Sequence, residues 1–328
     1  MILTKTPLRI SFFSGGSDLP SFYSKEDGAA LSVTISKYIY VMVHKTPHLG
    51  VKVMYDQIEE FPDVEAMQTN ITSETLKYFN IEKEITVASI SDILSKGSGL
   101  GSSSAFTVGL INALSASKWG VASNGYLADI ACEIEMNRCN YPVGKQDQYA
   151  AAYGGLNLFR FRKNGEVSVD HTNVSLSTLG KLESNLMLVY SGKGRSANSI
   201  LQKQSAAMSD ADKFNLVRRS RDKAFTGLEY LRNGDVDSFG DLLHEAWLDK
   251  KGVVSEITQD YFDDVYQNIR IAGAIGGKLL GAGGGGFFIF YVTPDKQEHV
   301  RHHIENYTSC KVYDFKFTDR GSQIVSIC

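Results

Sequence analysis

Apolar and polar residues along the first half of the chain predict a mixture of strands and helices. β-Branched and aromatic residues dominate 31–43, which predicts one or two strands, and 85–90 is a further short strand. The segment 103–118 has helical spacing, but its apolar residues face nearly all directions, so we expect a helix buried in the middle of the fold. The next helix, 124–138, carries a narrower apolar stripe. Projected at 100° per residue, Glu135 falls at the edge of that stripe.

The second half of the chain is richer in helical pattern. From about 196 to 274 the spacing of apolar residues is mostly helical, and Thr293-Pro294 is a suitable start for one more helix near the end. After the two helices of the first half we expect strands at 155–161 and 186–190, and towards the end of the chain at 278–280, 287–292 and 310–317. The change in character near residue 180 predicts an α+β protein with two domains, 1–180 and 181–328. The pattern leaves open which domain receives the final segment, 319–328.

Composition narrows the class of protein. The chain has 34 basic and 37 acidic side chains and a net charge of -3, which gives no basic excess for nucleic acid or a membrane surface. The longest uncharged stretch, 97–117, is too polar to span a bilayer, and the first residues do not form a signal peptide. The four cysteines form no CxxC pair, so we expect reduced thiols and a cytoplasmic protein. They are Cys132, Cys139, Cys310 and Cys328.

Twelve of the 30 glycines gather in three clusters, at 15–16, 97–101 and 276–286. Each cluster by itself could be a flexible turn; together they suggest three loops that meet at one ligand. The segment 97–105 runs directly into the buried helix. Its backbone N–H groups, the helix dipole and three hydroxyls make an anion site at a helix N-terminus.

Three familiar nucleotide loops do not fit this segment. A Walker A loop needs a lysine at its end, and the only lysine here, Lys96, comes before the loop. A dinucleotide fingerprint needs a third glycine where Ser102 stands. The downstream motifs of protein kinases are absent from the sequence.

The chain resembles the GHMP kinases (galactokinase, homoserine, mevalonate and phosphomevalonate kinases) in three motifs that occur in the family's order. They are Pro7-Leu-Arg9-Ile-Ser-Phe-Phe-Ser-Gly-Gly-Ser-Asp18, Gly99-Leu-Gly-Ser-Ser-Ser-Ala105 and Lys278-Leu-Leu-Gly-Ala-Gly-Gly-Gly-Gly286. The resemblance implies a two-lobed α+β fold. The N-terminal lobe would contain a left-handed βαβ crossover, the C-terminal lobe would be ferredoxin-like, and ATP and the acceptor would lie between them. The function implied is ATP- and Mg²⁺-dependent transfer of a phosphoryl group to an alcohol.

The resemblance also implies roles for individual residues. Asp147, five residues after Pro142, would be the general base, with Arg9 as the cation at the transferred group; Lys145 is a rival electrostatic contributor, and a capping role for Asp147 stays open. Ser103 and Glu135, seven residues before the proline, would bind Mg²⁺, although Glu135 could also be a partly solvated helix residue. The residues expected to bind ATP are Lys96, Gly97, Ser98, Gly99, Leu100, Gly101, Ser102, Ser103 and Ser104.

The first motif is the best indication of the acceptor. Phe13-Ser-Gly-Gly-Ser-Asp18-Leu-Pro-Ser-Phe-Tyr23 resembles the D-glycero-D-manno-heptose 7-phosphate kinase branch, from which Ser14 and Ser17 depart conservatively. The resemblance implies phosphorylation of the anomeric hydroxyl, with Asp18 accepting hydrogen bonds from the sugar. The basic turn Lys193-Gly194-Arg195 is either a site for the 7-phosphate or a solvated turn. The expected substrate-binding residues are Gly16, Ser17, Asp18, Lys145, Lys193, Arg195, Gly283 and Gly284.

Other functions remain open at this point. Kinases for fucose, galactose or mevalonate and a mevalonate diphosphate decarboxylase share the fold. A non-catalytic ligand sensor is the alternative outside the enzymes, although such copies usually lose the residues that are present here. We expect a sugar phosphate and ATP as partners, with no nucleic acid and no membrane; the sequence leaves open whether the chain forms a homodimer.

Overall fold

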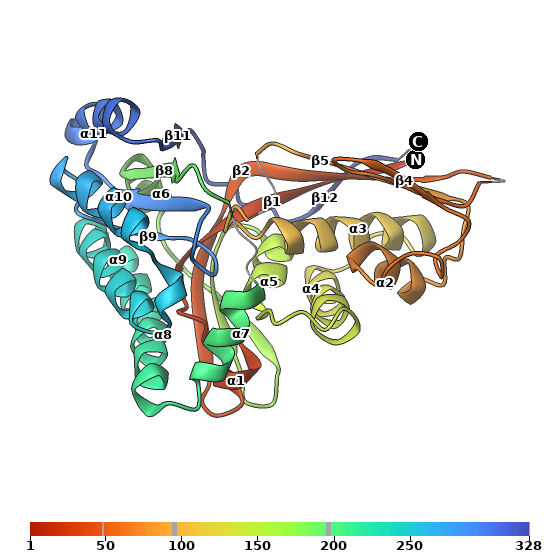
Figure 1. Cartoon of the computed structure of the whole chain (residues 1–328), viewed down its shortest axis with the longest axis horizontal. Helices are drawn as coiled ribbons and strands as arrows, with labels where there is room; N and C mark the ends of the chain where they lie inside the picture. Colours follow the sequence, from red (N-terminus) through yellow and green to blue (C-terminus); the bar gives the residue numbers. More distant parts are fainter. Residues whose placement is uncertain (48, 94–96, 195–197, 328) are drawn as a thin grey trace.

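The computed structural model of the chain describes residues 1–47, 49–93, 97–194 and 198–327, and it contains two β-sheets with helices packed against each (Figure 1). The first sheet has eight strands, in the order β12-β1-β2-β5-β3-β4, with β6 paired to β2 and β7 to β6. Its strands are β1 (Ile2–Phe13), β2 (Gly28–Lys45), β3 (Val51–Met54), β4 (Ile58–Phe61), β5 (Ile85–Ser91), β6 (Leu156–Phe161), β7 (Val167–His171) and β12 (Gln323–Ile327).

The long strand β2 organises the first sheet. One edge of β2 pairs with β1 between residues 31 and 43, while the other edge pairs with β6 in the first half of the strand and with β5 in the second half. The strand predicted over 31–43 is therefore confirmed and extends further at both ends. Strands β3 and β5 run parallel, and the chain between them passes through β4 and helix α2 (Ile71–Tyr78). The left hand of the βαβ crossover that the resemblance implies stays a prediction.

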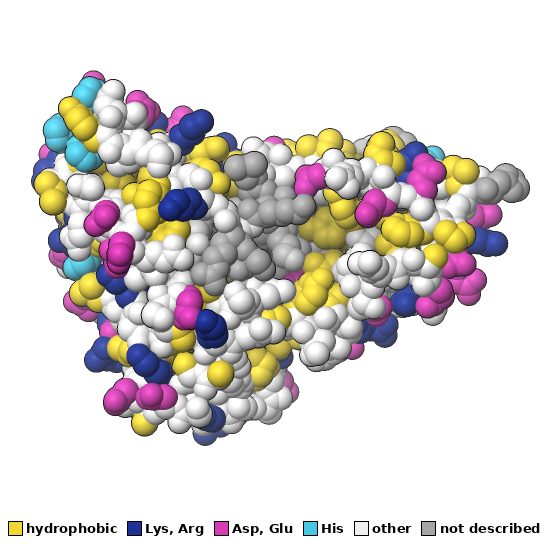
Figure 2. Space-filling model, viewed as in Figure 1, with side chains coloured by type: hydrophobic (Ala, Val, Ile, Leu, Met, Phe, Trp, Pro, Cys, Tyr) yellow, Lys and Arg dark blue, Asp and Glu magenta, His cyan; other side chains and the backbone are white. Residues whose placement is uncertain are grey.

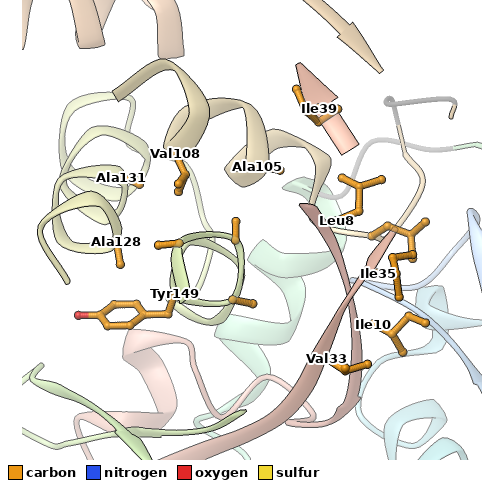
Figure 3. Packing of buried hydrophobic residues seen from close by; sticks show 14 of the residues in the cluster. Leu8, Ile10, Val33, Ile35, Ile39, Ala105, Val108, Ala128, Ala131 and Tyr149 are labelled. Carbon is orange, nitrogen blue, oxygen red and sulfur yellow. The ribbon is translucent and has the colours of Figure 1, made fainter. Parts of the chain in front are cut away.

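Four helices cover one face of this sheet (Figure 1). They are α2, α3 (Ser102–Lys118), α4 (Asn124–Cys132) and α5 (Gln146–Tyr153). As the sequence predicts, α3 is central and buried. In Figure 3, Val108 of α3 lies beside Ala128 and Ala131 of α4, with Tyr149 of α5 nearby and Leu8 of β1 on the sheet side. The small residues let the helices approach closely, so the start of α3 is fixed by packing on several sides.

The second sheet is smaller and entirely antiparallel, in the order β11-β8-β10-β9. In chain order this is a strand, a helical region, two strands, a helix and a strand, which is the ferredoxin-like arrangement that we expect. Its strands are β8 (Leu186–Tyr190), β9 (Gly276–Leu279), β10 (Phe287–Tyr291) and β11 (Lys311–Tyr313). The remaining helical segments of the chain are α1 (Pro20–Tyr23), α6 (Leu176–Ser184), α7 (Asn198–Ala207), α8 (Ala211–Arg232), α9 (Val236–Lys251), the 3₁₀ turn Ser255–Ile257, α10 (Asp260–Ile271) and α11 (Pro294–Tyr307).

The end of the chain returns to the first sheet. Strand β12 pairs with β1, so that Ile2 lies opposite Ile327 and both termini lie together (Figure 1). The predicted strand 310–317 is shorter than expected because the chain leaves the second sheet after Tyr313 and reaches the first sheet by a single bridge from Phe317 to Ile35. The division at residue 180 stays a prediction, and the last strand lies in the sheet of the first domain.

Two further sequence expectations concern the chain as a whole. Cys132, Cys139 and Cys310 are free thiols, and Cys328 lies outside the described residues. Within the described ranges, no helix has the length and apolar character needed to cross a bilayer.

Candidate active site

The glycine loop 97–101 leads directly into the first turn of α3. Gly101 caps the helix in the left-handed conformation, with φ 76°, and no side chain caps the first turn. An uncapped helix start leaves N–H donors for an anion. The hydroxyls of Ser98 and Ser102 lie 2.9 Å apart and stabilise the loop itself, whereas Ser103 is exposed on the first turn. Lys96 lies outside the described residues.

Arg9 and Asp147 form a two-pronged ion pair next to this loop. The guanidinium Nε lies 2.8 Å from Oδ1 of Asp147 and Nη2 lies 2.7 Å from Oδ2. Nη1 of Arg9 also donates to the carbonyl of Gly99 at 2.6 Å, so one side chain connects β1, the glycine loop and the first turn of α5. Arg9 is 3% exposed and Asp147 26%, which leaves the carboxylate, but not the guanidinium, open to a ligand. The pairing of the two residues in space is what the resemblance implies.

Glu135 is buried at a place where the helix widens. The chain continues from α4 into a π-helical turn, Glu133–Arg138, a local geometry that is frequent at functional sites. Oε2 of Glu135 accepts from the Ser104 hydroxyl and from Nε2 of Gln148, each at 3.0 Å. The carboxylate therefore points at the start of α3 and of α5. The alternative of a partly solvated glutamate does not hold, since the residue is 1% exposed.

The surroundings of Glu135 fit a cation. Oε1 is buried and has no hydrogen-bond partner among the described residues. Burial raises the pKa of Glu135 to about 7, and the charge of Asp147 adds to that rise. A divalent ion at Oε1 would remove the burial penalty, with the exposed Ser103 hydroxyl nearby on α3. No cluster of three acidic, His or Cys side chains occurs in the described part of the chain, so such an ion would depend on phosphate and hydroxyl oxygens as well.

Asp18 lies on the turn after β1 and faces the start of α5. Oδ1 accepts from the Ser14 hydroxyl at 3.1 Å, and Oδ2 lies 3.4 Å from the backbone N of Gln146. Gly144 passes so close to this carboxylate that any side chain there would overlap it. Burial raises the pKa of Asp18 to about 6, and the neighbouring Asp147 contributes to the rise. Two carboxylates thus converge beside the anion-binding loop.

The third glycine cluster, 276–286, packs directly on the glycine loop 97–101. A Cβ on Gly281 would lie 2.6 Å from Cα of Gly99, and a Cβ on Gly99 would lie 2.6 Å from the carbonyl O of Leu280. The backbone N of Phe287 donates to the Ser98 carbonyl at 3.0 Å. The loop of the second sheet that contains Gly281, Gly283 and Gly284 therefore touches loop 97–101. On the face shown in Figure 2, the surface is hollowed between the two halves of the molecule.

The other expected substrate residues differ in what they contact. The Ser17 hydroxyl donates to the carbonyl of Ala29 and accepts from its N–H, so it stabilises the turn. The Lys145 amine contacts the carbonyl of Gly165. Lys193 is exposed, with Nζ 3.8 Å from the centre of the Tyr261 ring, and its carbonyl accepts from Gly286 in the glycine loop. Arg195 lies outside the described residues.

Two glutamines at this site were not predicted from the sequence. Gln148 is fully buried and donates to Glu135, and Gln204 of α7 donates from Nε2 to the carbonyl of Gly15 at 2.8 Å. A Cβ on Gly16 would lie 2.5 Å from the same Gln204 amide, so α7 covers the first glycine turn. Gln148 directly follows Asp147 in the sequence, and this adjacency is a signal that places Gln148 at the same site. Nothing in the sequence pattern indicates that Gln204 reaches residues almost two hundred positions earlier.

The arrangement suits the transfer of a phosphoryl group. The N–H groups of the loop and helix start can hold an anion, the Arg9 guanidinium can offset negative charge, and Asp147 is a partly exposed carboxylate next to both. Asp147 can accept a proton from a hydroxyl placed between it and Asp18.

Known proteins with related sequence and structure are GHMP kinases. The model of the GHMP kinases N terminal domain matches 64–155 and that of the GHMP kinases C terminal matches 228–309. D-glycero-alpha-D-manno-heptose 7-phosphate kinase of Campylobacter jejuni is 30% identical over 98% of this chain and 97% of its own. The bifunctional fucokinase/GDP-fucose pyrophosphorylase of Arabidopsis thaliana is 26% identical over 94% of this chain and 32% of its own length.

Solved structures agree with this family. A D-glycero-D-manno-heptose 1-phosphate kinase from Bacteroides thetaiotaomicron has a TM-score of 0.82 and 25% identity, with full coverage of both chains. A mevalonate kinase has a TM-score of 0.74 at 17% identity, covering 98% of this chain and all of its own, and supports the fold alone. The expected two-sheet α+β fold is thus confirmed. The chain belongs to the GHMP kinases, enzymes that transfer a phosphoryl group from ATP to an alcohol.

Proposed function

We propose that the protein phosphorylates the anomeric hydroxyl of D-glycero-D-manno-heptose 7-phosphate and forms the 1,7-bisphosphate. The observation that carries the proposal is the 30% identity with the Campylobacter jejuni heptose 7-phosphate kinase over nearly the full length of both chains. The protein of known structure with a TM-score of 0.82 is also named a heptose kinase. A sugar 1-phosphate is the form that a nucleotidyl transfer would consume, so the product suits the synthesis of a nucleotide-activated heptose.

Asp18 and Asp147 are the residues that support an anomeric hydroxyl as the acceptor. The Asp18 carboxylate is buried beside Asp147 and retains lone pairs for sugar hydroxyls. Asp147 takes the proton of the attacking hydroxyl, and Arg9 fixes the orientation of that carboxylate through two hydrogen bonds. Glu135 and Ser103 would hold Mg²⁺, which when bound neutralises charge on the phosphates of ATP.

Lys193 is the described residue best placed for the distal phosphate of the substrate. Its side chain is exposed, and its backbone is hydrogen-bonded to the glycine loop that also contains Gly283 and Gly284. The amine lies over the Tyr261 ring, an exposed position from which it can turn to a phosphate. Arg195, expected to act with it, is outside the described residues.

A fucose-type sugar kinase is the second candidate, favoured by the 26% identity with the Arabidopsis fucokinase protein. That acceptor carries no phosphate, so it makes no use of Lys193. The two candidates therefore differ in a measurable way at one residue.

The test is ADP release with Mg·ATP and a panel of acceptors, followed by phosphorus NMR of the product. The panel contains heptose 7-phosphate, mannose 6-phosphate, fucose, galactose and mevalonate, and Asp147→Asn is the control for turnover by the active site. We expect turnover with the heptose phosphate, a new phosphate at C1, and at least a roughly 10-fold rise of KM for this acceptor in Lys193→Met. Turnover with fucose alone, unchanged in Lys193→Met, would replace the proposal with the second candidate.

A further inference from the structure

Two buried lysines lie close to the contact between the glycine loops 97–101 and 281–286. Neither has a role in the chemistry described above. They are Lys250, near the end of α9, and Lys278, in the middle of β9, each 5% exposed. A buried ammonium group is costly unless it is paired, and within the described ranges neither lysine forms an ion pair. The carboxylate next in sequence, Asp249, pairs with Arg219 and Lys223 instead.

Backbone carbonyls take the place of a counterion for both amines. Nζ of Lys250 donates to the carbonyls of Leu279 and Gly281, at 2.9 and 2.6 Å. These carbonyls lie at the end of β9 and at the start of the glycine-rich segment 281–286. Nζ of Lys278 donates to the carbonyls of Ser11 and Phe12, at 3.1 and 2.7 Å, just after Arg9 on β1.

The two hydrogen bonds of Lys278 connect the second sheet to β1, the strand of Arg9, while those of Lys250 fix the loop of the second sheet that packs on loop 97–101. Gly281, held by Lys250, packs on Gly99, whose carbonyl accepts from Nη1 of Arg9. Lys278 holds the strand that carries Arg9 from the other side. We propose that Lys250 and Lys278 are positioning residues, which align the two glycine loops and Arg9 for the triphosphate of ATP.

The charge of the pair supports the same role. Burial lowers the pKa of Lys278 to about 7, and the positive charge of Arg9 lowers it further; burial, Lys278 and Arg9 lower the pKa of Lys250. The groups that face this pair are thus Arg9 of β1 and, through Arg9, Asp147 of α5. A polyanion at the loop raises the pKa of both amines, so ATP binding near pH 8 draws protons onto them.

The test compares Lys250→Met and Lys278→Met with Lys223→Met. Lys223 is a matched control, because it is largely buried on α8 and pairs with Asp249 and Glu245, and among the described residues it forms no hydrogen bond or ion pair with either loop. Measurements are the Kd of a non-hydrolysable ATP analogue, kcat, KM for the acceptor and the melting temperature. We expect Kd to rise and kcat to fall, each about 10-fold or more, in the two loop variants, with both values within about twofold in the control.

A second measurement separates positioning from simple stability. Calorimetry in two buffers of different ionisation enthalpy at pH 8 gives the protons taken up with the analogue. We expect uptake in the wild type and in Lys223→Met, and a smaller uptake in Lys278→Met. If the methionine variants do not fold, Lys250→Gln and Lys278→Gln are measured by the same criteria. Unchanged Kd, kcat and proton uptake in variants whose melting temperature alone falls would overturn the proposal. Because the probe is the nucleotide, this result does not depend on the identity of the sugar.

Discussion

The two halves of the molecule contribute to the site in different ways. The first sheet and its helices supply ionisable side chains: Arg9, Asp18, Glu135 and Asp147, each held by side-chain or backbone hydrogen bonds. The second sheet supplies backbone, a glycine loop that packs on the first loop, and two lysines that bind carbonyls. The comparison suggests that the first half carries the chemistry and the second half fixes the geometry. A change in the first half should therefore affect proton transfer, the metal requirement or acceptor binding, and a change in the second half should affect nucleotide binding and, through the alignment of Arg9, kcat.

The largest effect is expected from Asp147→Asn. The amide cannot accept a proton from the acceptor hydroxyl, so kcat should fall about 10²- to 10⁴-fold. The measurement is steady-state ADP release with saturating ATP and acceptor. The control is Asp170→Asn. Asp170 lies on β7, is the ion-pair partner of Arg160, and is far in the sequence from the glycine loops 97–101 and 281–286. This variant should change kcat less than about twofold. Near-normal turnover of Asp147→Asn would move the role of base to another group.

Glu135→Gln should have the next largest effect. The amide keeps the size of the side chain but cannot neutralise a cation, so the Mg²⁺ concentration for half-maximal rate should rise about 10- to 100-fold. A magnesium titration at fixed ATP measures this. Glu133→Gln is the matched control, since it is partly exposed, lies two residues away and contacts Asn137 and Arg138 rather than Ser104 and Gln148. Equal shifts in both variants would contradict a metal role for Glu135.

Much of the site could be predicted from the sequence because its residues belong to short local motifs. Arg9, Asp147 and the glycine loop were assigned by resemblance, and the structure brings them within hydrogen-bond distance of one another. The full burial of Glu135 did not follow from the sequence, because a projection at 100° per residue assumes a regular α-helix and places Glu135 only at the edge of the apolar stripe. The π-helical turn changes the angle between successive residues at this place.

The contacts that sequence could not predict are those between distant segments. Lys278 is the first residue of the third sequence motif, but its hydrogen bonds to Ser11 and Phe12 depend on how the second sheet packs on the first. The same holds for β12, whose alternation suits either sheet until its pairing with β1 is known. The two hydrogen bonds between the Ser17 hydroxyl and the backbone of Ala29 in β2 likewise depend on how the turn folds against the sheet. The substrate role expected for Ser17 stays a prediction.

In the second half, Gly286→Ala should weaken nucleotide binding and stability together. Gly286 has φ 93° and lies against the Ser98 carbonyl, so a methyl group adds overlap to backbone strain. We expect a loss of about 2–4 kcal/mol in the free energy of unfolding and a rise in KM for ATP of roughly 10-fold. Urea unfolding and steady-state kinetics measure the two effects.

Gly120→Ala is the control for that prediction. Its φ is 94°, but a Cβ there meets nothing within 4 Å. It therefore has the same backbone strain without the overlap, and should lose about 1 kcal/mol with no change in KM for ATP. If both variants raise KM for ATP equally, the contact between the loops does not control nucleotide binding.

The smallest effect is a pH dependence that returns to the first half. Because burial raises the pKa of Asp18 from its usual 3.8 to about 6, the carboxylate that accepts sugar hydroxyls is lost as the pH falls through 6. KM for the acceptor should be constant at higher pH and rise several-fold, up to about 10-fold, between pH 6 and 5.

The free energy of unfolding should respond to pH in the opposite direction. A carboxyl whose pKa is raised by folding contributes stability at pH values below its unfolded pKa and loses that contribution as the pH rises through 3.8 towards 6. Asp18→Asn should remove both dependences while it raises KM at every pH. Glu135, whose pKa is also raised, acts on the metal and so should alter KM for Mg·ATP rather than KM for the acceptor. An acceptor KM that stays flat to pH 5 in the wild type would show that Asp18 is not a ligand of the sugar.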